Sequence, residues 1–130
     1  MRFSTLASTV LLSAAALAVP TKLAARSSRV YITSDPFWGY RENSGFFQAF
    51  DIEGADKCVD LKGTKFDNAI SSFGPDSGVK CIVYDGYNCT GQNEPIWYSG
   101  YADMGWNGWD NRVSSYECGF CTKGVDKGCL

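Results

Sequence analysis

The sequence Asp67-Asn68-Ala69-Ile70-Ser71-Ser72 returns 43 residues later as Asp110-Asn111-Arg112-Val113-Ser114-Ser115. An aromatic residue precedes and follows each copy, as Phe66 and Phe73 do in the first. A pattern of this length rarely occurs twice by chance in a chain of 130 residues. We therefore expect two structural repeats, each with a turn that presents oxygen atoms to a ligand.

The amino-terminal residues have the pattern of an export signal. Arg2 supplies a positive charge, residues 6–17 are apolar or small, and Ala16-Leu17-Ala18 fits a small-x-small cleavage site. The apolar stretch is shorter than the roughly 20 residues of a membrane span, so we expect no stable membrane insertion. We predict a signal peptide over residues 1–18, a short disordered or propeptide segment over 19–29, and a secreted, extracellular protein.

The mature chain is small and weakly acidic. Cleavage after Ala18 removes one basic residue, Arg2, and leaves 112 residues with 11 Lys and Arg against 14 Asp and Glu. This length fits one domain, and no basic cluster marks a nucleic-acid surface. We expect a monomer with no nucleic-acid partner.

Six cysteines lie in the mature chain, and behind a signal peptide an even number predicts three disulfides. They are Cys58, Cys81, Cys89, Cys118, Cys121 and Cys129. Fifteen pairings exist for six cysteines; a short hairpin suggests Cys81 with Cys89, and Cys58 could join the halves through Cys118. The tail would be tied down through Cys121 or Cys129. A zinc site at the Cys-x-x-Cys motif is disfavoured, because the chain has no histidine and the export route is oxidising.

Short runs of aromatic and β-branched residues, separated by turn formers, predict an all-β sandwich or barrel. The runs lie at residues 30–33, 46–50, 81–84, 96–98 and 113–118. The glycine-rich stretch 74–78 divides a single domain, residues 30–130, into motif one (about 30–76) and motif two (about 77–118), with a tail over 119–130. Four short strands in each half fit a Greek key.

Both halves resemble the Greek-key motifs of a βγ-crystallin domain in its microbial and fungal form. The calcium motif of that family, Asn/Asp-Asn/Asp-x-x-Ser/Thr-Ser, is matched at every fixed position by both copies of the repeated phrase. The family has a second sequence pattern, in which two aromatic residues are separated by four residues and the second aromatic is followed, after one further residue, by a glycine. The second half offers Tyr84, Cys89 and Gly91, with cysteine at the second aromatic position. In the first half, Tyr31, Phe37 and Gly39 approach the pattern with one residue too many.

The resemblance implies up to two Ca²⁺ ions, each held between the Asp/Asn turn of one motif and a loop of the other. It assigns ligand roles to Asp67, Asn68, Ala69 (carbonyl) and Ser71, to Asp110, Asn111, Arg112 (carbonyl) and Ser114, and to the carbonyl of Asp85. We interpret the second serines, Ser72 and Ser115, as structural. The alternative is that both phrases are only turns, since Asp, Asn and Ser stabilise turns through their own backbone. A cation at Arg112 would weaken the second site, so we predict unequal sites.

Three further sequence features lead to predictions about glycosylation, the core and an exposed surface. Asn88-Cys89-Thr90 is formally a glycosylation acceptor at Asn88. The aromatic residues between 97 and 109 favour the core over a stacking surface, because aromatics bury large areas. Trp38 and Tyr40, in a polar first hairpin, are candidates for an exposed partner surface.

The sequence thus predicts a small cysteine-rich secreted protein in which calcium stabilises the fold. With no histidine to act as a base, we expect no enzyme. The alternative is a secreted toxin, effector or protease inhibitor that acts on a foreign protein, glycan or membrane. A third hypothesis is a durable structural protein.

Overall fold

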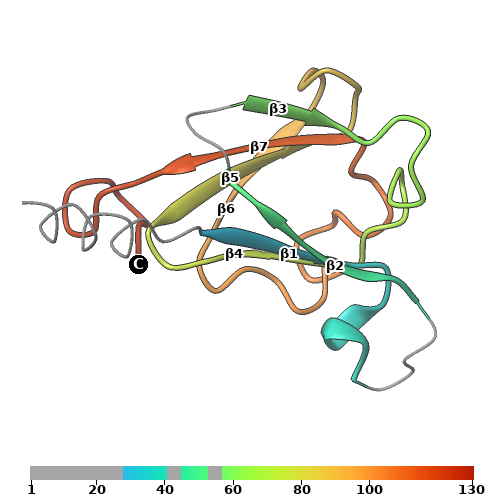
Figure 1. The fold of residues 1–130 in the computed structure, drawn as a ribbon, viewed down its shortest axis with the longest axis horizontal. Helices are drawn as coiled ribbons and strands as arrows, with labels where there is room; N and C mark the ends of the chain where they lie inside the picture. Colours follow the sequence, from blue (N-terminus) through green and yellow to red (C-terminus); the bar gives the residue numbers. More distant parts are fainter. Residues whose placement is uncertain (1–27, 41–44, 53–56) are drawn as a thin grey trace, which may run out of the picture.

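The computed structural model describes residues 28–40, 45–52 and 57–130, which form seven strands and one short 3₁₀ helix (Figure 1). The predicted signal peptide and propeptide segment lie almost wholly outside these residues. In chain order the elements are β1 (Arg29–Thr33), η2 (Pro36–Gly39), β2 (Phe47–Asp51), β3 (Lys57–Asp60), β4 (Ser72–Pro75), β5 (Val79–Tyr84), β6 (Asn93–Trp97) and β7 (Ser115–Phe120). No helix within the described ranges has the length and apolar character needed to cross a membrane.

Two antiparallel sheets pack face to face as a sandwich. One has the strand order β2-β1-β4, and the other has the order β3-β7-β5-β6. β3, from the first half, therefore pairs with β7 of the second half. In return, Tyr101 of the second half forms an isolated bridge with Phe73 of β4. The two Greek keys exchange their third strands, and the predicted all-β, two-motif fold is confirmed.

Alternating burial along the strands builds the core. In β5, Val79, Cys81 and Val83 are buried, while the residues between them are partly exposed, as expected when successive side chains point to opposite faces. The aromatic residues that follow the two phrases, Phe73 and Tyr116, meet between the sheets edge to face with ring centroids 5.5 Å apart. The repeated phrase therefore anchors the core as well as the turns.

Three disulfides join the six cysteines, as Cys58–Cys89, Cys81–Cys118 and Cys121–Cys129. The suggested pairs, Cys81 with Cys89 and Cys58 with Cys118, are wrong. Cys81 points into the core from β5 and faces Cys118 directly across the β5–β7 ladder. Cys89 lies beyond the end of β5, in the loop that reaches across to β3.

The carboxy-terminal tail is closed on itself by Cys121–Cys129 and is not cross-linked to the sandwich. Backbone hydrogen bonds attach it: Cys121 N donates to the Gly78 carbonyl oxygen, and Gly78 N donates to that of Leu130. Gly128 lies directly against the Trp97 ring, where a Cβ atom would come within 2.8 Å. The tail thus lies against the start of β5 and the end of β6.

Candidate metal site

The two repeated turns lie against each other and are joined by reciprocal backbone hydrogen bonds. Asn68 N donates to the Val113 carbonyl oxygen, and Asn111 N donates to that of Ile70, each at 3.0 Å. Both asparagines adopt a left-handed backbone, with φ of 53° and 57°, which asparagine tolerates better than most residues. The second residue of each phrase, Asn68 or Asn111, is therefore hydrogen-bonded to the other phrase.

The second serine of each phrase ties its turn to a hairpin. The Ser72 hydroxyl lies 2.7 Å from the Asp35 carbonyl oxygen and accepts a hydrogen bond from Trp38 N. The Ser115 hydroxyl lies 2.6 Å from the Gly86 carbonyl oxygen and, in the same way, accepts one from Cys89 N. Both serines are fully buried, so their hydroxyls are engaged in holding the fold.

These matching bonds correct the alignment of the first hairpin. Ser71 N donates to the Thr33 carbonyl and Ser114 N to the Tyr84 carbonyl, so Thr33 in the first hairpin corresponds to Tyr84 in the second. Trp38 corresponds to Cys89, because the backbone N of each donates to the second serine of a phrase. Tyr31 and Phe37 do not hold the positions suggested from the sequence. The first hairpin is longer than the second, and its additional residues lie after Trp38. Ser34 N donates to the carbonyl oxygen of Phe46, whereas the equivalent Asp85 N donates to that of Gln92, which is much closer in sequence.

Asp67 is the most distinctive side chain of the first turn. Its Oδ1 atom is buried and makes no hydrogen bond within the described part of the chain, while its Oδ2 accepts a hydrogen bond of 2.5 Å from the Tyr87 hydroxyl. That hydrogen bond raises the pKa of Tyr87, because the charged carboxylate favours the protonated phenol. A buried carboxylate oxygen without a donor is costly, and a bound cation would satisfy it.

Ligand candidates of the two turns meet across the repeats. The Ser114 hydroxyl donates to Asn68 Oδ1 at 3.2 Å, so the second turn's serine faces the first turn's asparagine. Tyr87 brings the loop of the second hairpin to Asp67 on the same turn. Oxygen atoms from the first turn, the second turn and the second hairpin therefore gather in one region.

The second turn is more open and more basic. Asp110 is exposed, and its Oδ2 lies 3.3 Å from Asn111 Nδ2. The Arg112 guanidinium stacks over the Trp109 ring, 4.5 Å from its centroid, and donates to the Gly108 carbonyl. It also lies 3.5 Å from Asp85 Oδ2, so this carboxylate faces the cation.

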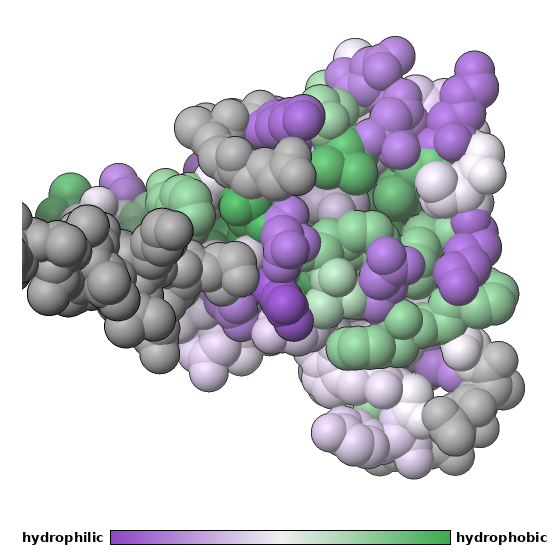
Figure 2. Space-filling model, viewed as in Figure 1, coloured by the Kyte–Doolittle hydropathy of each residue, from purple (hydrophilic) through white to green (hydrophobic). Residues whose placement is uncertain are grey.

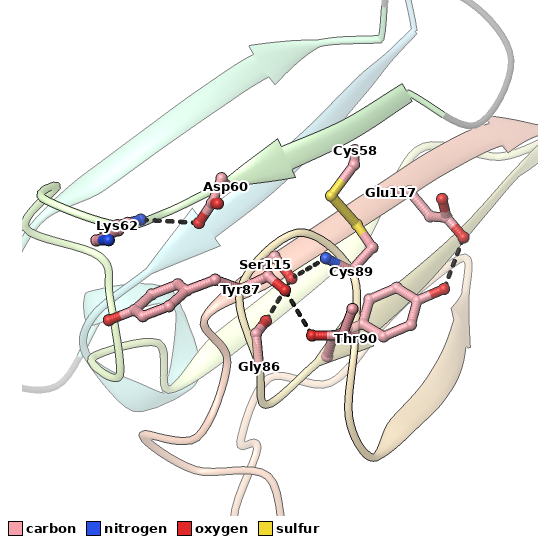
Figure 3. The surroundings of a disulfide bond; sticks show 10 residues. Cys58, Asp60, Lys62, Gly86, Tyr87, Cys89, Thr90, Ser115 and Glu117 are labelled. Carbon is pink, nitrogen blue, oxygen red and sulfur yellow. Dashed lines mark hydrogen bonds between the residues drawn. A yellow bond between two sulfur atoms is a disulfide. The ribbon is translucent and has the colours of Figure 1, made fainter.

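A disulfide fixes the loop that approaches the first turn (Figure 3). Cys89 is bonded to Cys58 on β3, and Cys89 N donates to the Ser115 hydroxyl at 2.8 Å. Thr90 Oγ1 closes the loop by donating to the Tyr87 carbonyl oxygen at 2.6 Å. Cysteine replaces the aromatic expected at this position, and it forms a disulfide with β3.

The donor atoms fit calcium better than a transition metal. No group of three or more His, Cys, Asp or Glu side chains suited to a metal ion occurs among the described residues, and all six cysteines are in disulfides. What the turns offer is carboxylate, amide, hydroxyl and backbone carbonyl oxygen, the hard ligands that Ca²⁺ prefers. The chemistry of the site therefore favours Ca²⁺.

The fold is similar to that of a βγ-crystallin domain from Flavobacterium johnsoniae, with a TM-score of 0.55, 20% identity, and coverage of 75% of this chain and 98% of that one. A βγ-crystallin from Ciona intestinalis matches with a TM-score of 0.51, 23% identity, and coverage of 68% and 95%. The chain has the βγ-crystallin fold. No family model and no curated protein matches its sequence.

Sequence reasoning missed two features of this βγ-crystallin fold. The role of Tyr87 was missed because a tyrosine in a polar loop gives no sign of its partner 20 residues away. The exposure of Trp106 and Tyr98, at 65% and 46%, contradicts the expectation that both lie in the core. Trp38 is half-buried, with its ring against Gly74, whereas Tyr40 is exposed as expected. Asn88 is also exposed, and its glycosylation stays a prediction.

Proposed function

We propose that this protein is a secreted βγ-crystallin-type domain that binds Ca²⁺ through its two repeated turns and is stabilised by it. The observation that carries the proposal is Asp67 Oδ1, which is buried and has no hydrogen-bond donor among the described residues. It lies on the turn where Asn68 Oδ1 and Ser114 Oγ approach to 3.2 Å. A hard cation is the ligand that such a group of oxygen atoms suits.

The residues that would hold the ions come from both repeats. They are Asp67, Asn68, the Ala69 carbonyl and Ser71, Asp110, Asn111, the Arg112 carbonyl and Ser114, with the Asp85 carbonyl. When bound, Ca²⁺ supplies no reaction and only links these oxygen atoms, so its role is to stabilise the contact between the two Greek keys.

The sites should differ in affinity. The first turn offers a partly buried carboxylate at Asp67, whereas Asp110 is exposed. The Arg112 guanidinium of the second turn lies 3.5 Å from the carboxylate of Asp85, whose carbonyl belongs to the proposed ligand set. With one carboxylate for each turn, affinity is modest, on the order of 10⁻⁴ M as in other extracellular calcium modules. Such a site is filled only where calcium is plentiful, as it is outside the cell.

Secretion rests on the predicted signal peptide together with the disulfides. All six cysteines are paired, and such bonds persist in oxidising compartments. Mass spectrometry of the mature protein from the culture medium of its producing cell tests this part. An amino terminus at or after residue 19 supports it, and retention of residues 1–18 contradicts it.

Titration calorimetry on the mature domain, followed by thermal melting with and without Ca²⁺, tests the binding. We expect heat of binding and a higher melting temperature at millimolar Ca²⁺, with weaker binding in Ser114→Ala and Ser71→Ala. Mg²⁺ is the control, because its smaller octahedral shell suits this flexible set of ligands less well. No heat and no gain in melting temperature at millimolar Ca²⁺ would show that the phrases are only turns.

A further inference from the structure

We infer that Phe37 and Trp106 form a binding surface for a neutral oligosaccharide built of pyranose rings. These two residues are called the aromatic patch below. Their rings contact each other edge to face with centroids 5.7 Å apart, and Trp106 is 65% exposed. Tyr40, whose backbone N donates to the Phe37 carbonyl oxygen, follows η2 and is 86% exposed. η2, which carries Phe37, is the short coil that projects beyond the sheets in Figure 1.

The internal repeat shows that this turn conformation does not require an aromatic residue. The equivalent residue of the second hairpin is Asn88, and both residues have φ of 56°. Asparagine adopts this left-handed conformation readily, whereas a bulky residue is strained there by roughly 1–2 kcal/mol. Phe37 N donates to the Ala102 carbonyl oxygen at 2.6 Å, which holds the strained backbone in place. The phenyl ring is therefore kept against its local conformational preference, as is common at binding sites.

Trp106 is likewise not used to fill the core. The turn beneath it is closed by Met104, which is fully buried, and by Trp109, which is 6% exposed. Trp106 N donates to the Asp103 carbonyl oxygen and Trp109 N to that of Met104. Asn107 Nδ2 also donates to Glu94 on β6. The turn is thus fixed on both sides while its indole faces solvent, which is the arrangement of a preorganised contact residue.

Within the described residues, the charged groups near the patch favour a neutral sugar over an anionic ligand. Asp103 lies in the same turn as Trp106 and accepts a hydrogen bond from Gly105 N, and Asp35 immediately precedes η2. The cations that lie over rings within the described residues contact other aromatics, such as Lys65 over Phe46 and Arg112 over Trp109. Carboxylates repel phosphate and anionic lipid but accept hydrogen bonds from sugar hydroxyls.

A pyranose ring also matches the shape of this surface. Its axial C–H groups form an apolar face that packs on the negative face of an aromatic ring, while its equatorial hydroxyls point outward toward polar neighbours. The lower part of the molecule in Figure 2, on the side where η2 projects in Figure 1, is mostly pale, which marks residues of intermediate hydropathy. The patch has the mixed apolar and polar character that such a ligand needs.

The test is an NMR titration of the isotope-labelled mature protein with cellohexaose, chitohexaose, laminarihexaose and mannohexaose, each at millimolar concentration. The indole N–H signals of Trp97 and Trp109 serve as internal controls. We expect at least one saccharide to shift the Trp106 signal in a saturable way, in EDTA as in Ca²⁺, because no residue of the patch belongs to the proposed metal site.

Three variants decide whether the patch is responsible. Trp106→Ala should weaken binding roughly tenfold, the loss of one aromatic contact. Phe37→Asn copies the second hairpin, so it should weaken binding while leaving the melting temperature equal or higher. Phe120→Ala, which removes an exposed aromatic at the end of β7, should bind like the wild type.

Several results would overturn the inference. They are the lack of any Trp106 shift with all four saccharides, undiminished saccharide binding by Trp106→Ala, and a Trp106 response to phosphatidylserine vesicles in place of saccharides. Because the titration is done with and without Ca²⁺, a protein that binds no calcium can still pass this test.

Discussion

Replacement of Asp67 by asparagine should have opposite consequences with and without calcium. Asp67 Oδ1 is buried without a hydrogen-bond donor among the described residues, and Asp67 Oδ2 accepts a hydrogen bond from the exposed Tyr87. Asp67→Asn keeps the shape of the side chain and removes its charge. In EDTA the variant should be as stable as the wild type or more stable by up to about 1 kcal/mol, since an unpaired charged oxygen is no longer held in the turn.

Calcium should reverse this order. At a concentration 100 times the dissociation constant, binding at one site adds about 2.7 kcal/mol of stability. For a domain of this size, that gain corresponds to a rise in melting temperature of roughly 10–20 °C. If loss of the carboxylate weakens binding tenfold, the gain at the same concentration falls to about 1.4 kcal/mol. The variant should then be less stable than the wild type.

The assay is a thermal melt monitored by near-UV circular dichroism, with EDTA and with a series of Ca²⁺ concentrations. Asp110→Asn is the matched control, because Asp110 occupies the same place in the second phrase but is exposed. We expect it to reduce the calcium-dependent shift by less than Asp67→Asn does. Equal calcium-dependent shifts in wild type and Asp67→Asn, or a larger loss in Asp110→Asn, would refute the reasoning.

Three further predictions concern the frame around the turns. The double variant Cys58→Ser/Cys89→Ser opens a loop with a sequence separation of 31 residues, so chemical denaturation should show a loss of about 3–4 kcal/mol of stability. Calorimetry should also show weaker Ca²⁺ binding, and unchanged calcium affinity would contradict the role of this disulfide in positioning the loop that approaches the first turn. Ser72→Ala leaves the partly buried Trp38 N without its acceptor and should lower the free energy of unfolding by about 1–3 kcal/mol in urea titration. A change below about 0.5 kcal/mol would contradict the structural role of Ser72. Burial raises the pKa of Tyr116 above the ordinary tyrosine value of about 10, so the folded state holds the phenol proton more tightly; stability should persist below pH of about 10 and fall above it. Unfolding midpoints on both sides of that pH test this, and an equal fall in Tyr116→Phe would contradict it.

The fold could be predicted because the repeated phrase and the aromatic residues beside it determine both the turns and part of the core. The aromatics around the repeated phrase, Phe66, Phe73, Trp109 and Tyr116, are all buried, and the phrases themselves join the two halves. The exchange of β3 and the Tyr101 segment between the sheets was not predictable, since neither segment differs in composition from an ordinary strand. Strand partnership depends on contacts between distant residues, which one sequence does not reveal.

The cysteine pairs show the same limit. Cys81 and Cys89 are close in sequence, yet Cys81 faces inward from β5 and Cys89 lies in the loop beyond it. The pairing with Cys118 depends on the register of β5 against β7, and that register follows from the whole sandwich. The Asp67–Tyr87 contact is likewise a product of tertiary packing, so composition identified the ligand types but not their neighbours.

The most direct test of the account is a crystal structure of the mature protein grown at millimolar Ca²⁺. We predict an ion beside the first turn, bound at about 2.3–2.6 Å by oxygen atoms that include Asp67 Oδ1 and atoms of the opposite repeat. A structure in which Asp67 Oδ1 has only water or protein neighbours under these conditions would contradict the claim that the repeated phrase binds calcium.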